Sequence, residues 1–295
     1  MKTDKTIVVL VNNLEYFKFM CDHFPKNIND FYFVAINEQR IGDKTKEIQK
    51  ILEDSICNSF KVFGSDLILE KFKSEVINVP FVDSYTMGMN ILQIWFVFKY
   101  LKGVDKVLTL DDDVILGCGE KLAGLFEEEH CHFQHCRLSA GLVDYDKNSE
   151  NAKRVYESWW KCYDITWSEE FWKEYLFRYA NSGQIFIVKD EFDFERYEEQ
   201  LKKFFQDETF EYFWNERRTH CSWYFDERFL TLFFFDKLNN ELQRKKYSKL
   251  LLNKEDKFTE TSLAKIVRST AIVHVACNSH KKKVYEKIER GLKNV

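Results

Sequence analysis

The chain has 295 residues, 45% of them hydrophobic and 31% charged, with 28 Phe, 14 Tyr and 7 Trp but only 10 Gly and 2 Pro. This composition supports a full hydrophobic core, and it excludes a disordered chain, a collagen-like repeat and a disulfide-held miniprotein. The net charge of −4 disfavours a dedicated nucleic-acid binder, because such proteins normally carry a basic excess.

Nothing in the sequence predicts export or a membrane span. The apolar run 7–11 is too short for a signal-peptide core, and no stretch approaches the roughly 20 apolar residues of a spanning helix. The eight cysteines are scattered along the chain, so we expect reduced thiols and a cytoplasmic protein. The basic run 281–283 is typical of a solvated helix face, with a peripheral membrane contact as the alternative.

Strands and helices alternate in the first part of the chain. Short apolar runs predict strands, and helical spacing or helix-ending signals predict the helices between them. The expected strands are 6–11, 31–36 and 106–110, and the expected helices are 14–24, 44–58 and 84–102, the last ended by Gly103. The segment 61–69 has no clear pattern. This order favours a mainly parallel sheet with crossover helices.

The second part of the chain is richer in aromatic residues. Amphipathic helices are expected over 150–180 and 192–216, with the apolar strand 184–188 between them. A last apolar strand covers 272–275 and is followed by a terminal helix at 281–292. Because no repeat or linker interrupts the chain, we expect one continuous domain over 1–295.

Three consecutive aspartates, Asp111 to Asp113, follow the third predicted strand. Adjacent carboxylates repel one another unless a cation lies among them, and a plain turn needs no more than one Asp. Asp111 and Asp113 share one side of an extended chain, so they can converge on a divalent ion. The carboxyl ends of strands in an open α/β sheet face the ligand crevice. The alternative is a solvated acidic strand end.

These residues resemble the nucleotide-sugar site of GT-A glycosyltransferases, in which a long helix and an apolar strand precede Asp-x-Asp. Three later segments occur in the order of glycosyltransferase family 8 and its relatives. Residues 179–187 resemble its Asn-Ser/Ala-Gly strand, 226–231 its Asp-Gln-(Asp/Glu)-x-Leu-Asn helix start, and 273–282 its late His segment. Glu227 replaces the Gln of family 8, and the late Gly and Pro-Trp are absent. The resemblance therefore indicates the GT-A superfamily rather than that one family.

The resemblance implies a single GT-A, Rossmann-like α/β domain with a mixed, mainly parallel central sheet flanked by helices. Residues 1–116 would bind the nucleotide sugar, and the helical, aromatic-rich part 117–295 would bind the acceptor. It implies a hexosyl- or pentosyltransferase that moves a sugar from a nucleoside diphosphate sugar, UDP-sugar first, to a hydroxyl of a glycan or glycoconjugate. Similar transferases without a membrane anchor occur in bacterial surface-glycan pathways and in large DNA viruses.

The resemblance also implies site residues. Mn²⁺ or Mg²⁺ would be held by Asp113 and His274, with Asp111 sharing the ion or contacting the ribose. Asp112 would face a sugar hydroxyl or support the ligands, and Lys281, or else Lys282, would contact the leaving phosphate. The expected donor contacts are Val11, Asn12, Asn90, Asp111, Asp112, Asn181, Gln184 and Lys281. Several have ordinary alternatives: His274 as a structural residue, the lysines as a solvated helix start, and Asn12 as a helix cap.

Asp226 is the first choice for the general base that deprotonates the acceptor, with Glu227 as the alternate. One of the two is explained equally well as a helix cap or a first-turn acid. A retaining enzyme would instead place Gln184 or Asp226 near the anomeric carbon, and the sequence does not decide the stereochemistry. One or two tryptophans are expected to stack on the acceptor sugar, from Trp159, Trp160, Trp167, Trp172, Trp214 and Trp223.

Three rival functions remain. Three His and two Cys between His130 and Cys136 suggest a zinc site, although no second pair lies at finger spacing, and a helix end followed by a strand explains the segment otherwise. A haloacid-dehalogenase-type phosphohydrolase also uses Asp-x-Asp after a strand, but it needs Thr or Val where this chain has Ile115. A non-catalytic sugar-binding module is the third.

Overall fold

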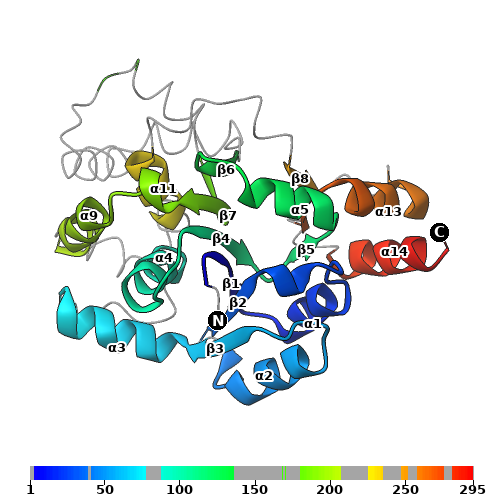
Figure 1. Cartoon of the computed structure of the whole chain (residues 1–295), viewed down its shortest axis with the longest axis horizontal. Coiled ribbons are helices and arrows are strands. Elements are labelled where there is room, and N and C mark those ends of the chain that lie inside the picture. Colours follow the sequence, from blue (N-terminus) through cyan, green and yellow to red (C-terminus); the bar gives the residue numbers. More distant parts are fainter. Residues whose placement is uncertain are drawn as a thin grey trace.

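The computed structural model describes residues 3–38, 41–77, 88–135, 168, 170, 180–206, 225–234, 247–251, 258–275 and 281–294, with the backbone alone at 134, 135, 180–182, 225, 227, 228 and 250. Within these ranges a six-stranded sheet forms the centre of the molecule, with the strand order β3-β2-β1-β4-β7-β6 (Figure 1). Four strands are parallel: β1 (Lys5–Val11), β2 (Tyr32–Asn37), β3 (Phe60–Gly64) and β4 (Lys106–Asp111). The strands β7 (Ala180–Val188) and β6 (His132–His135) join as antiparallel neighbours.

The central strands are apolar because they are covered on both faces. Every residue of β1 after Lys5 is buried, and so is every residue of β2. This burial explains why their sequences are continuous apolar runs rather than alternating ones. β4 lies between β1 and β7, so its carboxyl end reaches the middle of one edge of the sheet.

Helices of two kinds flank the sheet. The helix α4 (Met89–Tyr100) is buried along most of its length, because it packs against β1 as well as against three other helices. The other helices in the described ranges are α1 (Leu14–Asp22), α2 (Thr45–Glu53), α3 (Ser65–Glu75), α5 (Gly119–Phe126), α9 (Phe194–Gln206), α11 (Phe225–Phe233), α13 (Glu260–Ser269) and α14 (Lys281–Lys293), with short 3-10 turns at Ile28–Asp30 and Lys189–Glu191. Most of these show one buried stripe, as surface helices do.

A second, three-stranded sheet continues directly from the first. After β4 the chain turns through Asp112 and Asp113 into β5 (Val114–Leu116), which pairs antiparallel with β9 (Ile272–Val275). β9 pairs in turn with β8 (Ser248–Leu251). The helices α13 and α14 pack against one another beside this small sheet (Figure 1). The second sheet therefore attaches the C-terminal part of the chain to the aspartate turn.

The α/β architecture predicted from the sequence is confirmed, with a mixed, mainly parallel central sheet. The region 61–69 contains nearly all of β3 and the start of α3, so the aspartate strand is the fourth rather than the third in the chain. The helix predicted over 44–58 is shorter and ends at Glu53. β7 lies beside β4, so segments from both sides of residue 116 share one sheet. The helices expected at 150–180 fall almost wholly outside the described residues.

None of the helices in the described ranges is both long enough and apolar enough to cross a membrane.

Candidate active site

The candidate site lies at the carboxyl end of β4. Asp111 is the last residue of that strand, paired with Leu10 of the parallel neighbour β1. Asp113 is the second residue of the turn, and its backbone carbonyl accepts a 3.0 Å hydrogen bond from the N–H of Val275 in β9. Val114 is paired with His274 in the antiparallel register of β5 and β9. Two sheets therefore bring three chain segments to one point.

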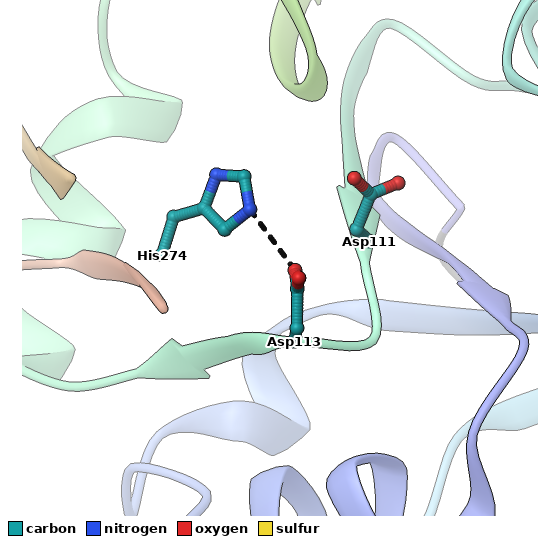
Figure 2. A group of neighbouring side chains, drawn as sticks. All are labelled: Asp111, Asp113 and His274. Carbon is teal, nitrogen blue, oxygen red and sulfur yellow. Dashed lines mark ion pairs between the residues drawn. The ribbon is translucent and has the colours of Figure 1, made fainter. Parts of the chain in front are cut away.

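Asp111, Asp113 and His274 form a cluster in which one ligand atom of each lies within 4.8 Å of the others (Figure 2). Nε2 of His274 and Oδ1 of Asp113 form an ion pair and lie 3.0 Å apart. Two carboxylate oxygens and one imidazole nitrogen are donors that Mn²⁺ accepts, and Mg²⁺ accepts the oxygens most readily. The three side chains therefore fit the divalent ion expected from the sequence.

Burial and neighbouring charges shift the pKa values of all three residues in the cluster. Burial and the neighbouring Asp113 raise the pKa of Asp111 to about 7. Burial alone would also raise the pKa of Asp113, but His274 and Lys281 outweigh it and bring that pKa to about 2. Burial disfavours the charged imidazole, yet Asp113 and Asp111 raise the pKa of His274 above its usual value. The cluster thus favours positive charge at its centre.

Lys281, the first residue of α14, forms an ion pair with Oδ2 of Asp113. Burial opposes its positive charge, but Asp113 outweighs this effect and raises the pKa of the ammonium group. The structure therefore brings together four residues that the sequence singled out: Asp111, Asp113, His274 and Lys281. Lys282 is exposed and has no resolved contact with the cluster among the described residues.

Asp112 has a different environment from its two neighbours. Its side chain is buried, and its Oδ2 accepts hydrogen bonds from the backbone N–H groups of Asn12, at 2.7 Å, and of Asn13. The side chain of Asn13, rather than that of Asn12, caps α1 by accepting from the N–H groups of Glu15 and Tyr16. The expected donor contacts Val11 and Asn12 therefore lie at a turn that Asp112 holds against β4.

A second pair lies on the helices beside the cluster. Nδ2 of Asn90, in α4, donates a 2.6 Å hydrogen bond to Oδ2 of Asp226, in α11. Asp226 is 2% exposed, and its charge adds to the raised pKa of Asp111. Asp226 is the second residue of α11, so it lies inside the first helical turn rather than before it. The side chain of the alternate base, Glu227, lies outside the described residues.

Gln184 and Asn181 are both on β7. Gln184 is paired with Leu110, one residue before Asp111, and is 3% exposed. Neither atom of its side-chain amide has a hydrogen-bond partner among the described residues. The side chain of Asn181 is not described, and neither are the six tryptophans proposed for sugar stacking.

The described part of the His130–Cys136 segment does not form a metal cluster. Nδ1 of His130 lies 2.7 Å from Glu191, and the backbone N–H of Cys131 donates to the same carboxylate. The zinc hypothesis also needs His135 and Cys136, whose side chains lie outside the described residues. The helix end and strand expected otherwise are present as α5 and β6.

Sequence reasoning missed an aromatic group beside the site. Tyr285 stacks on Tyr16 with ring centroids 5.0 Å apart, and the ammonium of Lys281 lies 5.7 Å from the centre of the Tyr16 ring. The spacing of Lys281 and Tyr285, four residues apart on one helix, was the available signal, because such residues share a face.

No protein-family model and no curated protein sequence matches this chain. In structure it is similar to the bifunctional glycosyltransferase WbbM, with a TM-score of 0.57 and 11% identity over 99% of this chain and 52% of WbbM. It is also similar to mouse xyloside xylosyltransferase 1 (TM-score 0.49, 11% identity, 93% of this chain and 98% of that one) and to the galactosyltransferase LgtC (0.41, 14%, 97% and 95%). This chain thus spans about half the length of WbbM, and its architecture is the GT-A glycosyltransferase fold expected from the sequence.

Proposed function

We propose that this chain is a metal-dependent glycosyltransferase of the GT-A type, which moves a sugar from a nucleoside diphosphate sugar to a hydroxyl of a glycan or glycoconjugate. The observation that carries the proposal is the cluster of Asp111, Asp113 and His274 at the carboxyl end of the central strand β4, with Lys281 paired to it. An enzyme that expels a diphosphate needs positive charge beside the leaving group, and the two carboxylates and the imidazole of the cluster can hold a divalent cation there.

Each residue of the cluster has a role in binding the donor. Asp113 and His274 hold Mn²⁺ or Mg²⁺, and Asp111 shares the ion or contacts the ribose of a UDP-sugar. When bound, the ion supplies positive charge to the departing diphosphate. Lys281 exchanges its carboxylate partner for a phosphate oxygen.

The donor's nucleoside lies over the end of β1. The N–H of Asn12 donates to Asp112, which positions Asn12 and the preceding Val11 there, and both residues contact the base and ribose. Asn181, Gln184 and Asn90 lie on elements that border the sugar. We expect UDP as the nucleotide first, because the family that the sequence resembles uses UDP-sugars.

Asp226 accepts the proton of the attacking acceptor hydroxyl. Its carboxylate is buried and is oriented by the amide of Asn90, which is the arrangement that a general base needs. Glu227 is the alternate base. In a retaining enzyme Asp226 or Gln184 lies beside the anomeric carbon instead. We further propose that the enzyme works in the cytoplasm in glycan biosynthesis, with α14 available for a peripheral membrane contact.

Calorimetric titration with UDP, in Mn²⁺ and in EDTA, tests the proposal. We expect binding that strengthens with Mn²⁺ and is lost in Asp113→Ala, whereas Asp54→Ala, an exposed residue outside the site, binds as the wild type does. UDP affinity that is the same in Mn²⁺ and EDTA would contradict the proposal. Phosphate release from a generic phosphate ester, lost in Asp111→Asn, would establish the rival hydrolase.

A further inference from the structure

Tyr285 is a buried tyrosine whose hydroxyl has no hydrogen-bond partner among the described residues. The residue is 5% exposed, and its ring is fixed on two sides by α1. It stacks on Tyr16 at 5.0 Å between centroids and meets Phe19 edge-on at 4.6 Å. Burying a hydroxyl without a hydrogen-bond partner costs free energy, so packing alone does not explain a tyrosine at this position.

Tyr285 lies on the helix that carries Lys281 of the candidate site. Tyr285 is four residues after Lys281 on α14, so both side chains project from one face of that helix. Lys281 on this face pairs with Asp113. Burial raises the pKa of the Tyr285 hydroxyl, and the charges of Asp113 and Asp112 raise it further, which means that the group stays a neutral donor.

The ring of Tyr16 connects the two donors. Its centroid lies 5.7 Å from the ammonium of Lys281, and the same ring stacks on Tyr285. The backbone N–H of Tyr16 donates to the side chain of Asn13, whose own N–H donates to Asp112. The aromatic pair is therefore tied to the turn at which the nucleotide is proposed to bind.

We propose that Tyr285 is a diphosphate-binding residue, whose hydroxyl donates a hydrogen bond to a phosphate oxygen of the nucleoside diphosphate alongside Lys281. This inference rests on the proposed function, and it adds a neutral donor that the sequence did not indicate. A phosphate oxygen supplies the acceptor that the hydroxyl lacks, and the bound anion draws Lys281 away from Asp113. The negative charge of the ligand is then shared between an ammonium and a phenol one helical turn apart.

The substitution Tyr285→Phe tests this role, because it removes the hydroxyl and keeps the stacked ring. We expect the dissociation constant of UDP in Mn²⁺ to rise about tenfold or more, the range for a lost hydrogen bond to a charged group. We expect the affinity for Mn²⁺ alone, and for uridine measured by ligand-observed NMR, to stay within twofold. The melting temperature should stay the same or rise, because no bond within the protein is lost.

Tyr197→Phe is the matched control for stability. Its hydroxyl is also buried but donates a 2.9 Å hydrogen bond to the carbonyl of Ile91, so its loss should lower the melting temperature. Tyr100→Phe, at a hydroxyl paired with Glu75 outside the site, should leave UDP affinity unchanged.

The possible failures are distinguishable. Wild-type protein that does not bind UDP in Mn²⁺ contradicts the proposed function. Wild-type protein that binds UDP while Tyr285→Phe binds it equally well contradicts the role of Tyr285 alone. An equal loss of uridine or of Mn²⁺ affinity in the variant also overturns that role, because the hydroxyl would then serve the nucleoside or the metal cluster.

Discussion

The backbone N–H of Asn12 donates a 2.7 Å hydrogen bond to Oδ2 of Asp112, which joins the end of β1 to the turn after β4. The N–H of Asn13 donates to the same oxygen. Both donors precede the first turn of α1, where a helix carries partial positive charge, so a carboxylate is well placed there. The aspartate triplet thus has two tasks: Asp111 and Asp113 face the cluster with His274, and Asp112 fastens two strand ends together.

Replacing Asp112 with Ala is expected to destabilise the fold. The two N–H groups would lose their acceptor, at a cost of about 1–3 kcal/mol in the free energy of unfolding. Asp112→Asn, which keeps one acceptor oxygen, should cost less. Chemical denaturation followed by circular dichroism measures both, with Asp54→Ala as the exposed control. Equal stability of the Ala variant and the wild type would show that these hydrogen bonds contribute nothing.

Asp111→Asn is expected to stabilise the metal-free protein at alkaline pH. The pKa of Asp111 is raised to about 7, so the folded state keeps a proton that the unfolded chain loses near pH 4. Wild-type stability should therefore fall relative to the Asn variant as the pH rises from about 4 to about 7. Above that range the variant should be more stable by up to about 4 kcal/mol. Thermal unfolding of both proteins in EDTA at pH 5 and pH 8 measures the difference in stability. If the advantage of the Asn variant over the wild type becomes smaller as the pH rises, the expectation is wrong.

Asp113→Asn should have the opposite effect on the same metal-free protein. The pKa of Asp113 is lowered to about 2, so its charged form stabilises the fold above pH 4, and this contribution is lost only as the pH falls toward 2. The variant leaves Lys281 and His274 without their carboxylate, and we expect it to lose about 2 kcal/mol or more at pH 7. Both variants should lose the rise in melting temperature that Mn²⁺ and UDP produce in the wild type. If a variant keeps this rise in melting temperature, the aspartate replaced in it is not a ligand of the ion.

Asp226→Asn is expected to separate transfer from donor binding. If Asp226 is the base, its loss should lower the turnover of a UDP-sugar by about 10²–10⁴-fold. The affinity for UDP should change less than twofold. Asn90→Ala removes only the 2.6 Å hydrogen bond that orients the carboxylate, so its turnover should lie between those of the wild type and Asp226→Asn. Hydrolysis of the UDP-sugar, in which water takes the place of the acceptor hydroxyl and loses its proton to the base, releases UDP and measures turnover without knowledge of the acceptor. An Asp226→Asn variant that keeps wild-type turnover would rule out Asp226 as the base.

The parts of the fold that the sequence predicts well are those in which burial dictates the residues. β1 and β2 are apolar runs, and β4 is apolar apart from Thr109 between its end residues, because both faces of these strands are covered. β3 is the edge strand of the same sheet, and its side chains are half-buried or exposed, so it has no such run and was not predicted. β3 is held in place by its pairing with β2, and this pairing cannot be read from the residues of β3 alone.

The site residues, too, could be predicted from the sequence only where the signal lies within one segment of the chain. The repulsion among three adjacent carboxylates is local, so it could be read from the sequence and it predicted Asp111 and Asp113. The pairing of Val114 with His274, and the hydrogen bond from Asn90 to Asp226, join residues more than 100 positions apart. Only the resemblance to a known family singled out those partners beforehand. The spacing of Lys281 and Tyr285 places both on one face of a helix, but neither this local pattern nor the resemblance shows that the Tyr285 hydroxyl lacks a partner among the described residues.

Gly117 lies where the chain leaves β5 for α5, and its substitution by Ala is expected to destabilise the fold. Its N–H donates a 2.9 Å hydrogen bond to the carbonyl of Ala271, and a methyl group on it would collide with the backbone carbonyl oxygens of Val267 and Thr270. Because backbone atoms cannot rotate away, we expect Gly117→Ala to cost at least about 2–3 kcal/mol and to displace β5 from β9. Gly124→Ala is the matched control: it lies inside α5 with its nearest neighbour 3.8 Å from the added carbon, so it should be neutral or stabilising by up to about 1 kcal/mol. Urea unfolding of both variants, with Mn²⁺ binding measured in parallel, checks the contrast. Since β5 and β9 position Asp113 and His274, Gly117→Ala should also weaken Mn²⁺ binding. If this variant instead has the stability and the Mn²⁺ affinity of the wild type, the structure tolerates the added methyl group and the prediction is wrong.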